Sequence, residues 1–166
     1  MGIEMIRLRK MQAGEFQDYL AYFIPDYAAE ISTNYDVDPQ AARVRAEQEV
    51  EADLGQGVDS PGQDLFCIAI DGARDALVVG YFWCKPGGNG GAVFISDFCI
   101  LPPFRGKGYA KLALAALEAE YASAGHCDIR LRVAADNDRA QHLYQAAGFQ
   151  ATGINMRKPL AEERSE

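Results

Sequence analysis

The spacing of hydrophobic residues changes along the chain, and each spacing predicts a kind of element. Met5 to Arg9 alternates apolar and basic residues, as a half-buried strand does. Apolar residues then recur at helical spacing before Pro25. A second helix is expected from 38 to 55, because Asp38 is a good N-cap and Pro39 suits the first turn.

The middle of the chain is rich in β-branched and aromatic residues. Three apolar runs cover 65–70, 77–84 and 92–101, and the connecting sequences DGARD and KPGGNGG contain turn-forming residues. Three consecutive strands with short connections predict an antiparallel meander.

A helical stripe of apolar residues follows Gly108 and ends at Gly125. The alternating sequence at 129–133 predicts another strand. Because a strand, a helix and a strand follow one another between 92 and 134, the two strands are expected to be parallel with a right-handed crossover.

The last helix is expected at 138–147, where Asp138 and Gln141 have the spacing of a capping box. Residues 149–160 are expected to form a final strand or hairpin. Together the elements predict one α/β domain over residues 1–166: a single mixed, mostly antiparallel sheet with helices on both faces.

Composition agrees with a folded, soluble chain. Apolar residues make up 49% of the sequence and charged residues 24%, which is globular composition. No apolar run has the length of a membrane helix or a signal peptide, so a cytoplasmic protein without membrane contact is expected. The four cysteines form no CxxC pair and there are two histidines, which argues against disulfides and against a metal site.

The net charge of −8 is concentrated in one part of the chain. Residues 11–64 carry a charge of −10, whereas residues 1–10 carry +2 and residues 65–166 are neutral. This distribution disfavours nucleic-acid binding, which needs a basic face. Two interpretations stay open: solvated faces of two helices, or a surface for a cationic partner.

A glycine-containing loop precedes the helix that starts after Gly108. Backbone amides at a helix N-terminus suit a phosphate, and glycines let a ligand approach closely. Taken alone, turn geometry explains such a loop more often than ligand binding does. It consists of Arg105, Gly106, Lys107, Gly108, Tyr109 and Ala110.

A second motif, NDRAQHLYQAAGF at 137–149, makes the chain resemble the GNAT superfamily of N-acetyltransferases. The loop has the family's pattern of Gln or Arg, x, x, Gly, x, Gly or Ala, and the later helix has the pattern NxxAxxLYxxxGF. The close match spans roughly residues 92–160. The resemblance implies the GNAT fold, acetyl-CoA as cosubstrate, an amine acceptor and no metal; homodimers are frequent in the family.

The resemblance also implies roles for parts of the chain. Residues 65–160 would form the acetyl-CoA-binding core, residues 1–64 would cover the acceptor, and residues 161–166 would be a tail. The amides and charges of 105–110 would hold the CoA pyrophosphate. The Ile100 backbone would pair with the pantetheine arm and offer an oxyanion donor, and Pro102 would mark where the strand leaves its neighbour.

Three polar side chains are candidates for direct roles. Tyr144 matches the family tyrosine that protonates or hydrogen-bonds the CoA sulfur, although its spacing also fits a core position. Asp97 is the acid inside an apolar strand, so it is a candidate general base or a carboxylate bonded to a neighbour. Asn137 is a helix cap that could also contact the cofactor.

The function expected from the resemblance is N-acetyl transfer by direct attack of a primary amine on a bound thioester. The acceptor would be a small cationic amine or a protein or peptide amine, and Tyr27, Glu30 and Tyr35 could line its side of the site. The alternative is a catalytically idle acyl-CoA-binding sensor or partner-binding module.

Overall fold

Five strands form one mixed sheet in a computed structural model, which describes residues 5–71 and 76–160. The strands are β1 (Ile6–Lys10), β2 (Asp64–Asp71), β3 (Ala76–Pro86), β4 (Val93–Ile100) and β5 (Ile129–Leu131), and they lie in that order. Strands β1 to β4 pair antiparallel, and β5 pairs parallel with β4. The predicted meander and parallel pair are confirmed.

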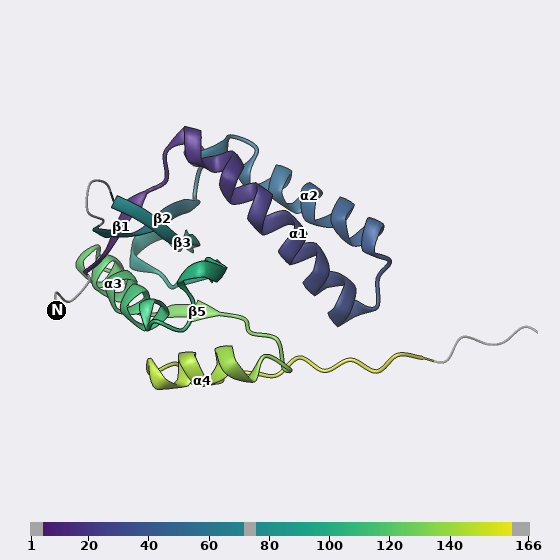
Figure 1. The fold of residues 1–166 in the computed structure, drawn as a ribbon. Coiled ribbons are helices and arrows are strands. Elements are labelled where there is room, and N and C mark those ends of the chain that lie inside the picture. Colours follow the sequence, from purple (N-terminus) through teal and green to yellow (C-terminus); the bar gives the residue numbers. More distant parts are fainter. Residues whose placement is uncertain (1–4, 72–75, 161–166) are drawn as a thin grey trace, which may run out of the picture.

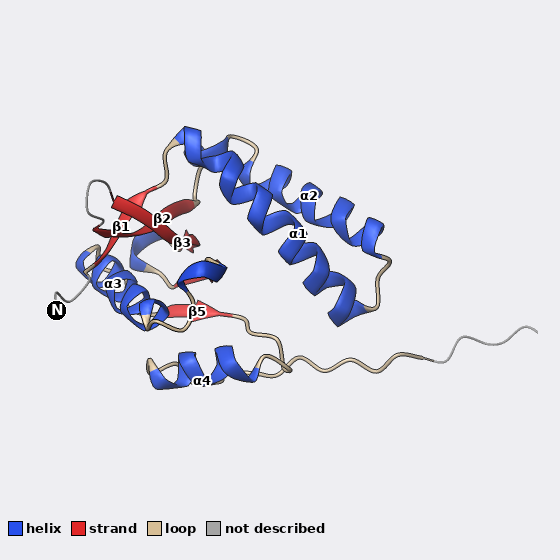
Figure 2. Cartoon of the chain, in the orientation of Figure 1, coloured by secondary structure: helices blue, strands red, loops and turns tan. Residues whose placement is uncertain are grey.

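Helices cover both faces of the sheet (Figures 1 and 2). They are α1 (Phe16–Tyr35), α2 (Pro39–Leu54), α3 (Tyr109–Ser123) and α4 (Asp138–Ala146). Helices α1 and α2 pack together on one face, and α3 and α4 lie on the other. None of the described helices is both long and apolar enough to cross a membrane.

The two faces bury separate hydrophobic cores, and strand β3 contributes to both. Phe82 and Cys84 point into the core under α3, whereas Tyr81 and Trp83 point into the core under α1 and α2. This alternation is the period of two that a strand imposes on its side chains. Three of the four cysteines are buried, as expected, and Cys127 is exposed.

Helix α1 continues through Pro25 for ten more residues, to Tyr35. A proline inside a helix removes one hydrogen bond and costs about 3 kcal/mol. Burial offsets this cost because Phe23, before the proline, and Ile31, after it, are both buried. The helix therefore carries residues beyond Pro25 out over the sheet.

The helix caps are partly as expected. Asp38 caps α2 by accepting from two backbone amides, and Pro39 follows it in the first turn. The predicted capping box of α4 is wrong: Asn137, not Asp138, accepts from the Ala140 amide. The Gln141 side chain instead donates to carbonyl groups of the preceding loop.

The predicted final strand or hairpin is also wrong. Residues 149–160 form neither strand nor turn, and in Figure 1 this segment runs past α4 and away from the sheet. It pairs with no strand of its own chain among the described residues. Most of the DGARD turn and the tail at 161–166 lie outside the described residues.

Candidate active site

Strands β4 and β5 separate soon after they begin to pair. Their register joins Val93–Ile95 to Ile129–Leu131, while β4 stays paired with β3 as far as Ile100. The edge of β4 that faces β5 is therefore open from Ser96 onward. The strands were expected to separate at Pro102; they do so earlier because β5 is only three residues long.

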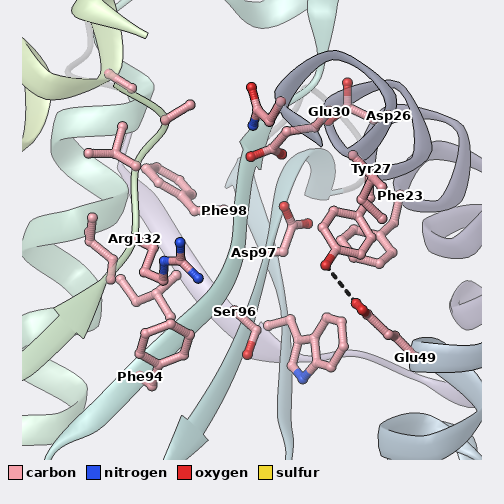
Figure 3. A pocket seen from close by; sticks show the side chains of 18 of the residues that line it. Phe23, Asp26, Tyr27, Glu30, Glu49, Phe94, Ser96, Asp97, Phe98 and Arg132 are labelled. Atoms are coloured by element: carbon pink, nitrogen blue, oxygen red, sulfur yellow. Dashed lines mark hydrogen bonds between the residues drawn. The ribbon is translucent and has the colours of Figure 1, made fainter. Parts of the chain in front are cut away.

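A cavity of about 580 Å³ opens where the two strands separate. Its walls come from α1, α2, β4, the segment after β5, and α4 (Figure 3). Asp97 and Tyr144 both line it, so the structure brings the two candidate catalytic residues into one space. Tyr27, Glu30 and Tyr35, which the sequence suggested for the acceptor side, also line it.

A β-bulge shapes the β4 wall. Trp83 pairs with Asp97 and Cys84 pairs with Ile95, so Ser96 has no opposite residue on β3. Bulges re-aim side chains and are frequent beside active sites. The Ser96 hydroxyl lines the cavity and is buried without a hydrogen-bond partner among the described residues. The bulge depends on strand register, which the sequence does not display, and Ser96 was therefore missed.

Asp97 is held by a tyrosine from helix α1. The Tyr19 side chain is fully buried, and its hydroxyl donates a hydrogen bond to Asp97 Oδ2 at 2.8 Å. Burial raises the pKa of Asp97 to about 7; the Tyr19 hydrogen bond lowers this pKa, and the nearby charges of Asp26 and Glu30 raise it. A carboxyl group with this pKa can accept a proton near neutral pH.

Tyr144, which lies on α4, lines the cavity. Its ring meets Phe149 edge-on, with centroids 5.6 Å apart. Burial raises the pKa of Tyr144 to about 12, and the charge of Asp97 contributes. The hydroxyl is therefore protonated at neutral pH, and it has no hydrogen-bond partner among the described residues. Tyr144 packs on the core and also lines the cavity, so the two sequence interpretations are compatible.

The glycine loop has an unusual backbone. Gly106 and Gly108 have φ of +77° and +82°, a left-handed region that favours glycine. Gly108 is the N-cap of α3, and no side chain caps this helix. The loop is exposed, including Lys107, whereas the Tyr109 side chain is buried in the core and Ala110 is half-buried. Tyr109 and Ala110 can therefore contact a ligand through their backbone rather than through their side chains.

Arg105 turns back toward the sheet. Its Nε donates to the Ile100 carbonyl at 2.8 Å, and its Nη2 donates to the Tyr22 hydroxyl at 3.1 Å. Arg105 thus ties the loop to β4 and α1, in addition to supplying charge. Since the Leu101 amide donates to Val79 on β3, and N–H directions alternate along a strand, the Ile100 amide points toward the open edge.

Asn137 both caps helix α4 and lines the cavity. Its Oδ1 accepts from the Ala140 amide at 3.1 Å, which confirms the predicted cap, and the residue lines the cavity beside Tyr144. Its side-chain oxygen is used locally, so the amide nitrogen is the part left for a ligand.

The side of the cavity formed by α1 and α2 is negatively charged. Glu49 and Asp53 are paired with cations, Arg45 at 3.3 Å and Lys85 at 2.8 Å. Asp26 and Glu30 have no ion-pair partner among the described residues; they lie on the α1 wall above Asp97 (Figure 3). Burial raises the pKa of Glu30, and the charge of Asp26 raises it further.

A single cation faces these carboxylates across the cavity without an ion pair among the described residues. Arg132, which follows β5, points its guanidinium toward β4 (Figure 3), and its charge lowers the pKa of Glu30. No group of three or more potential metal ligands occurs in residues 5–71 and 76–160. Because the carboxyl groups that line the cavity outnumber its cations, the cavity is a polar site with excess negative charge.

Known proteins resemble this chain in sequence. Residues 26–149 match the model of the Acetyltransferase (GNAT) family. The chain is 36% identical over 157 residues to the uncharacterized N-acetyltransferase YycN of Bacillus subtilis strain 168, covering 93% of this chain and 99% of that protein. It is 31% identical over 156 residues to the uncharacterized N-acetyltransferase YdgE of the same strain, covering 92% and 97%.

The fold is shared with solved structures. The crystal structure of YycN superposes with a TM-score of 0.87, covering 95% of this chain and 100% of that chain. Spermidine N-acetyltransferase from Vibrio cholerae, solved in complex with CoA and spermine, has the same fold at 18% identity, with a TM-score of 0.64 and coverage of 90% and 83%. With the separated strands, the glycine loop and a family match over most of its length, this chain belongs to the GNAT family of N-acetyltransferases.

Proposed function

We propose that the protein transfers the acetyl group of acetyl-CoA to a primary amine of a small cationic acceptor, by direct attack in a ternary complex. Family membership supports acyl transfer to nitrogen. The observation that carries the choice of acceptor is the pair of carboxylates, Asp26 and Glu30, that have no ion-pair partner among the described residues and lie beside Asp97 in one cavity.

Acetyl-CoA would lie along the open edge of β4. The exposed amides of the glycine loop and the N-terminus of α3 would bind the pyrophosphate, since both present N–H groups and a positive dipole end. The pantetheine amides would pair with the unpaired backbone edge of β4, as an added strand does. The Ile100 amide, which points to this edge, would then stabilise the oxyanion of the thioester carbonyl.

The reaction requires proton transfers, and a side chain of the cavity can accept the first proton. An alkyl ammonium with a pKa of about 10 must first lose a proton, and Asp97 would accept it. The neutral nitrogen would attack the carbonyl carbon, forming the C–N bond, and the C–S bond would break. The nitrogen would then release its second proton to the departing sulfur, giving the free CoA thiol, and Asp97 would return the first proton to solvent.

Tyr144 would stabilise the leaving thiolate mainly as a hydrogen-bond donor. Its pKa of about 12 lies above that of a thiol, about 8.5, so complete proton transfer from the phenol to sulfur is uphill. A hydrogen bond to a charged acceptor is nevertheless stronger than one to a neutral acceptor. The free hydroxyl of Tyr144 in the cavity supports this role.

A polyamine or another molecule with several cationic groups fits the acceptor side. One ammonium would lose its proton to Asp97, while a second would remain charged beside Asp26 and Glu30. The spermidine acetyltransferase that shares this fold was solved with spermine, itself a polyamine, which supports this class.

The test is release of free CoA thiol from acetyl-CoA with a panel of polyamines, amino sugars, amino acids and peptide amines. We expect turnover with cationic amines, and a raised KM for them in the Asp26→Asn, Glu30→Gln double variant. Glu51→Gln is the matched control, because Glu51 is an exposed α2 residue that does not line the cavity. If acetyl-CoA raised the Tm while no amine accelerated thiol release, the idle acyl-CoA sensor would be the correct description.

A further inference from the structure

Arg132 lies on the same face of the sheet as Asp97. Ile129 and Leu131 of β5 pack against the core under α3. Because side chains alternate along a strand, Arg132, the next residue, projects toward the face that α1 covers. Asp97 is on that face too, since it accepts a hydrogen bond from α1, and both residues line the cavity. Arg132 therefore brings a positive charge into the space where the amine must react.

Arg132 has no ion-pair partner among residues 5–71 and 76–160. Arg130, two residues earlier on β5, is by contrast paired with Asp128 at 3.1 Å and does not line the cavity. Glu30 lies across the cavity from Arg132, near enough for the arginine charge to lower the pKa of Glu30, but the two side chains form no ion pair. The cation is thus left available to a ligand.

The cavity consequently offers charges of both signs on opposite walls (Figure 3). The planar guanidinium of Arg132 suits a carboxylate, which an arginine can bind through two parallel hydrogen bonds. Asp26 and Glu30, on the α1 wall, suit an ammonium. A simple polyamine supplies only cations, and those nearest Arg132 would be repelled. An amino acid head group carries an ammonium and a carboxylate on one carbon, so it matches both walls at once.

We propose that the cavity selects a diamino acid as acceptor, with its α-carboxylate bound by Arg132. The α-ammonium would lie beside Asp26 and Glu30, and the side-chain amine would reach Asp97 and attack the thioester. The inference rests on the proposed function, which it narrows from cationic amines in general to those that also carry a carboxylate. Arg132 is then a residue that determines specificity and takes no part in the proton transfers.

Matched substrates isolate the contribution of the carboxylate. L-Lysine differs from cadaverine, and L-ornithine from putrescine, by this group alone. We expect the wild-type kcat/KM to be at least about tenfold higher for each diamino acid than for its diamine, mainly through KM, as for a hydrogen bond to a charged group. Arg132→Gln should remove this preference and improve turnover of the diamines, because it deletes a like charge. Arg132→Lys, which keeps the charge but not the planar fork, should restore the preference in part.

Arg130→Gln is the matched control. It removes the same kind of side chain from the same strand, but this residue is outside the cavity and already paired. We expect it to keep the wild-type preference for diamino acids. Circular dichroism and the Kd for acetyl-CoA should be unchanged in the variants at both positions.

Calorimetry on the complex of the enzyme with CoA measures acceptor binding without any reaction. We expect Arg132→Gln to raise the Kd of L-lysine at least about tenfold and to leave that of cadaverine unchanged or lower. Equal wild-type kcat/KM within each substrate pair, an equal effect of Arg132→Gln on both members, or weaker acetyl-CoA binding in this variant would overturn the inference and leave acetyl transfer to cationic amines standing. If no amine were acetylated while L-lysine still bound in an Arg132-dependent manner, the proposed function would fail and the carboxylate subsite would stand.

Discussion

The Tyr19 hydroxyl donates a 2.8 Å hydrogen bond to Asp97, joining helix α1 to strand β4 beside the cavity. The two residues are 78 positions apart in the chain. Asp97 remains only partly buried and lines the cavity, so the bond positions the carboxylate without sealing it off. The pKa of this carboxyl is therefore raised by burial and lowered in part by a residue from helix α1.

The first prediction concerns the pH dependence of turnover. Asp97 must be ionised to accept a proton, and its pKa is about 7. We expect kcat/KM for a cationic amine to rise with pH to a plateau above a midpoint near this value, because the protonated form predominates below it. Asp97→Asn should lower kcat/KM by roughly 10²–10⁴ and remove the midpoint. A variant with the wild-type profile would exclude Asp97 as the base.

The second prediction concerns Tyr19. Its hydrogen bond lowers the pKa of Asp97, because it stabilises the carboxylate. Tyr19→Phe should therefore move the midpoint of the kcat/KM profile to higher pH. Tyr81→Phe is the matched control: Tyr81 lies in the same core with its ring 5.1 Å from that of Tyr19, but it makes no hydrogen bond to Asp97. Equal shifts in both variants would show that packing, not the hydrogen bond, sets the midpoint.

The third prediction separates binding from chemistry at Tyr144. Tyr144→Phe keeps the ring that packs against Phe149 and removes the hydroxyl of this cavity-lining residue. We expect kcat to fall by roughly 10²-fold or more, as for loss of a donor to developing charge. The Kd for acetyl-CoA, measured by calorimetry, should change little. An unchanged kcat would remove Tyr144 from the reaction.

Not all of these contacts could be predicted from the sequence. The strands and helices follow from local periodicity, and Asp97 is visible as an acid within an apolar strand. Its partner Tyr19 has the spacing of an ordinary core residue of α1, and only the packing of α1 on the sheet brings them together. Ser96 was hidden for the same reason, since its bulge depends on the register of two strands.

Two further segments differ from the sequence prediction because of the structure that surrounds them. Pro25 is compatible with α1 because buried residues on both sides of it hold the helix to the sheet and to α2. Residues 149–160 have the alternation of a strand, but a strand requires a paired edge, and these residues pair with no strand in the described part of the chain. In both cases the local signal was insufficient, and the surroundings decided the structure.

The fourth prediction tests the glycine loop. Gly108→Ala places a side chain at φ +82°, where strain costs roughly 1 kcal/mol, although the added carbon meets no atom within 4 Å. We expect the loop to shift its amides and the Kd for acetyl-CoA to rise, while kcat at saturation changes less. Gly14→Ala is the control, because Gly14 has similar open space and no left-handed backbone. Equal Kd values would show that the loop conformation does not matter for binding.

The early separation of β4 from β5 has a consequence for selectivity. A sheet edge at the rim of a protein accepts almost any extended chain, but this edge opens into a cavity walled by α1 and α4. We therefore expect the edge to accept a slender, unbranched molecule whose own N–H and C=O groups alternate and satisfy its backbone. Thickness and amide spacing would then select ligands before any side chain recognises charge.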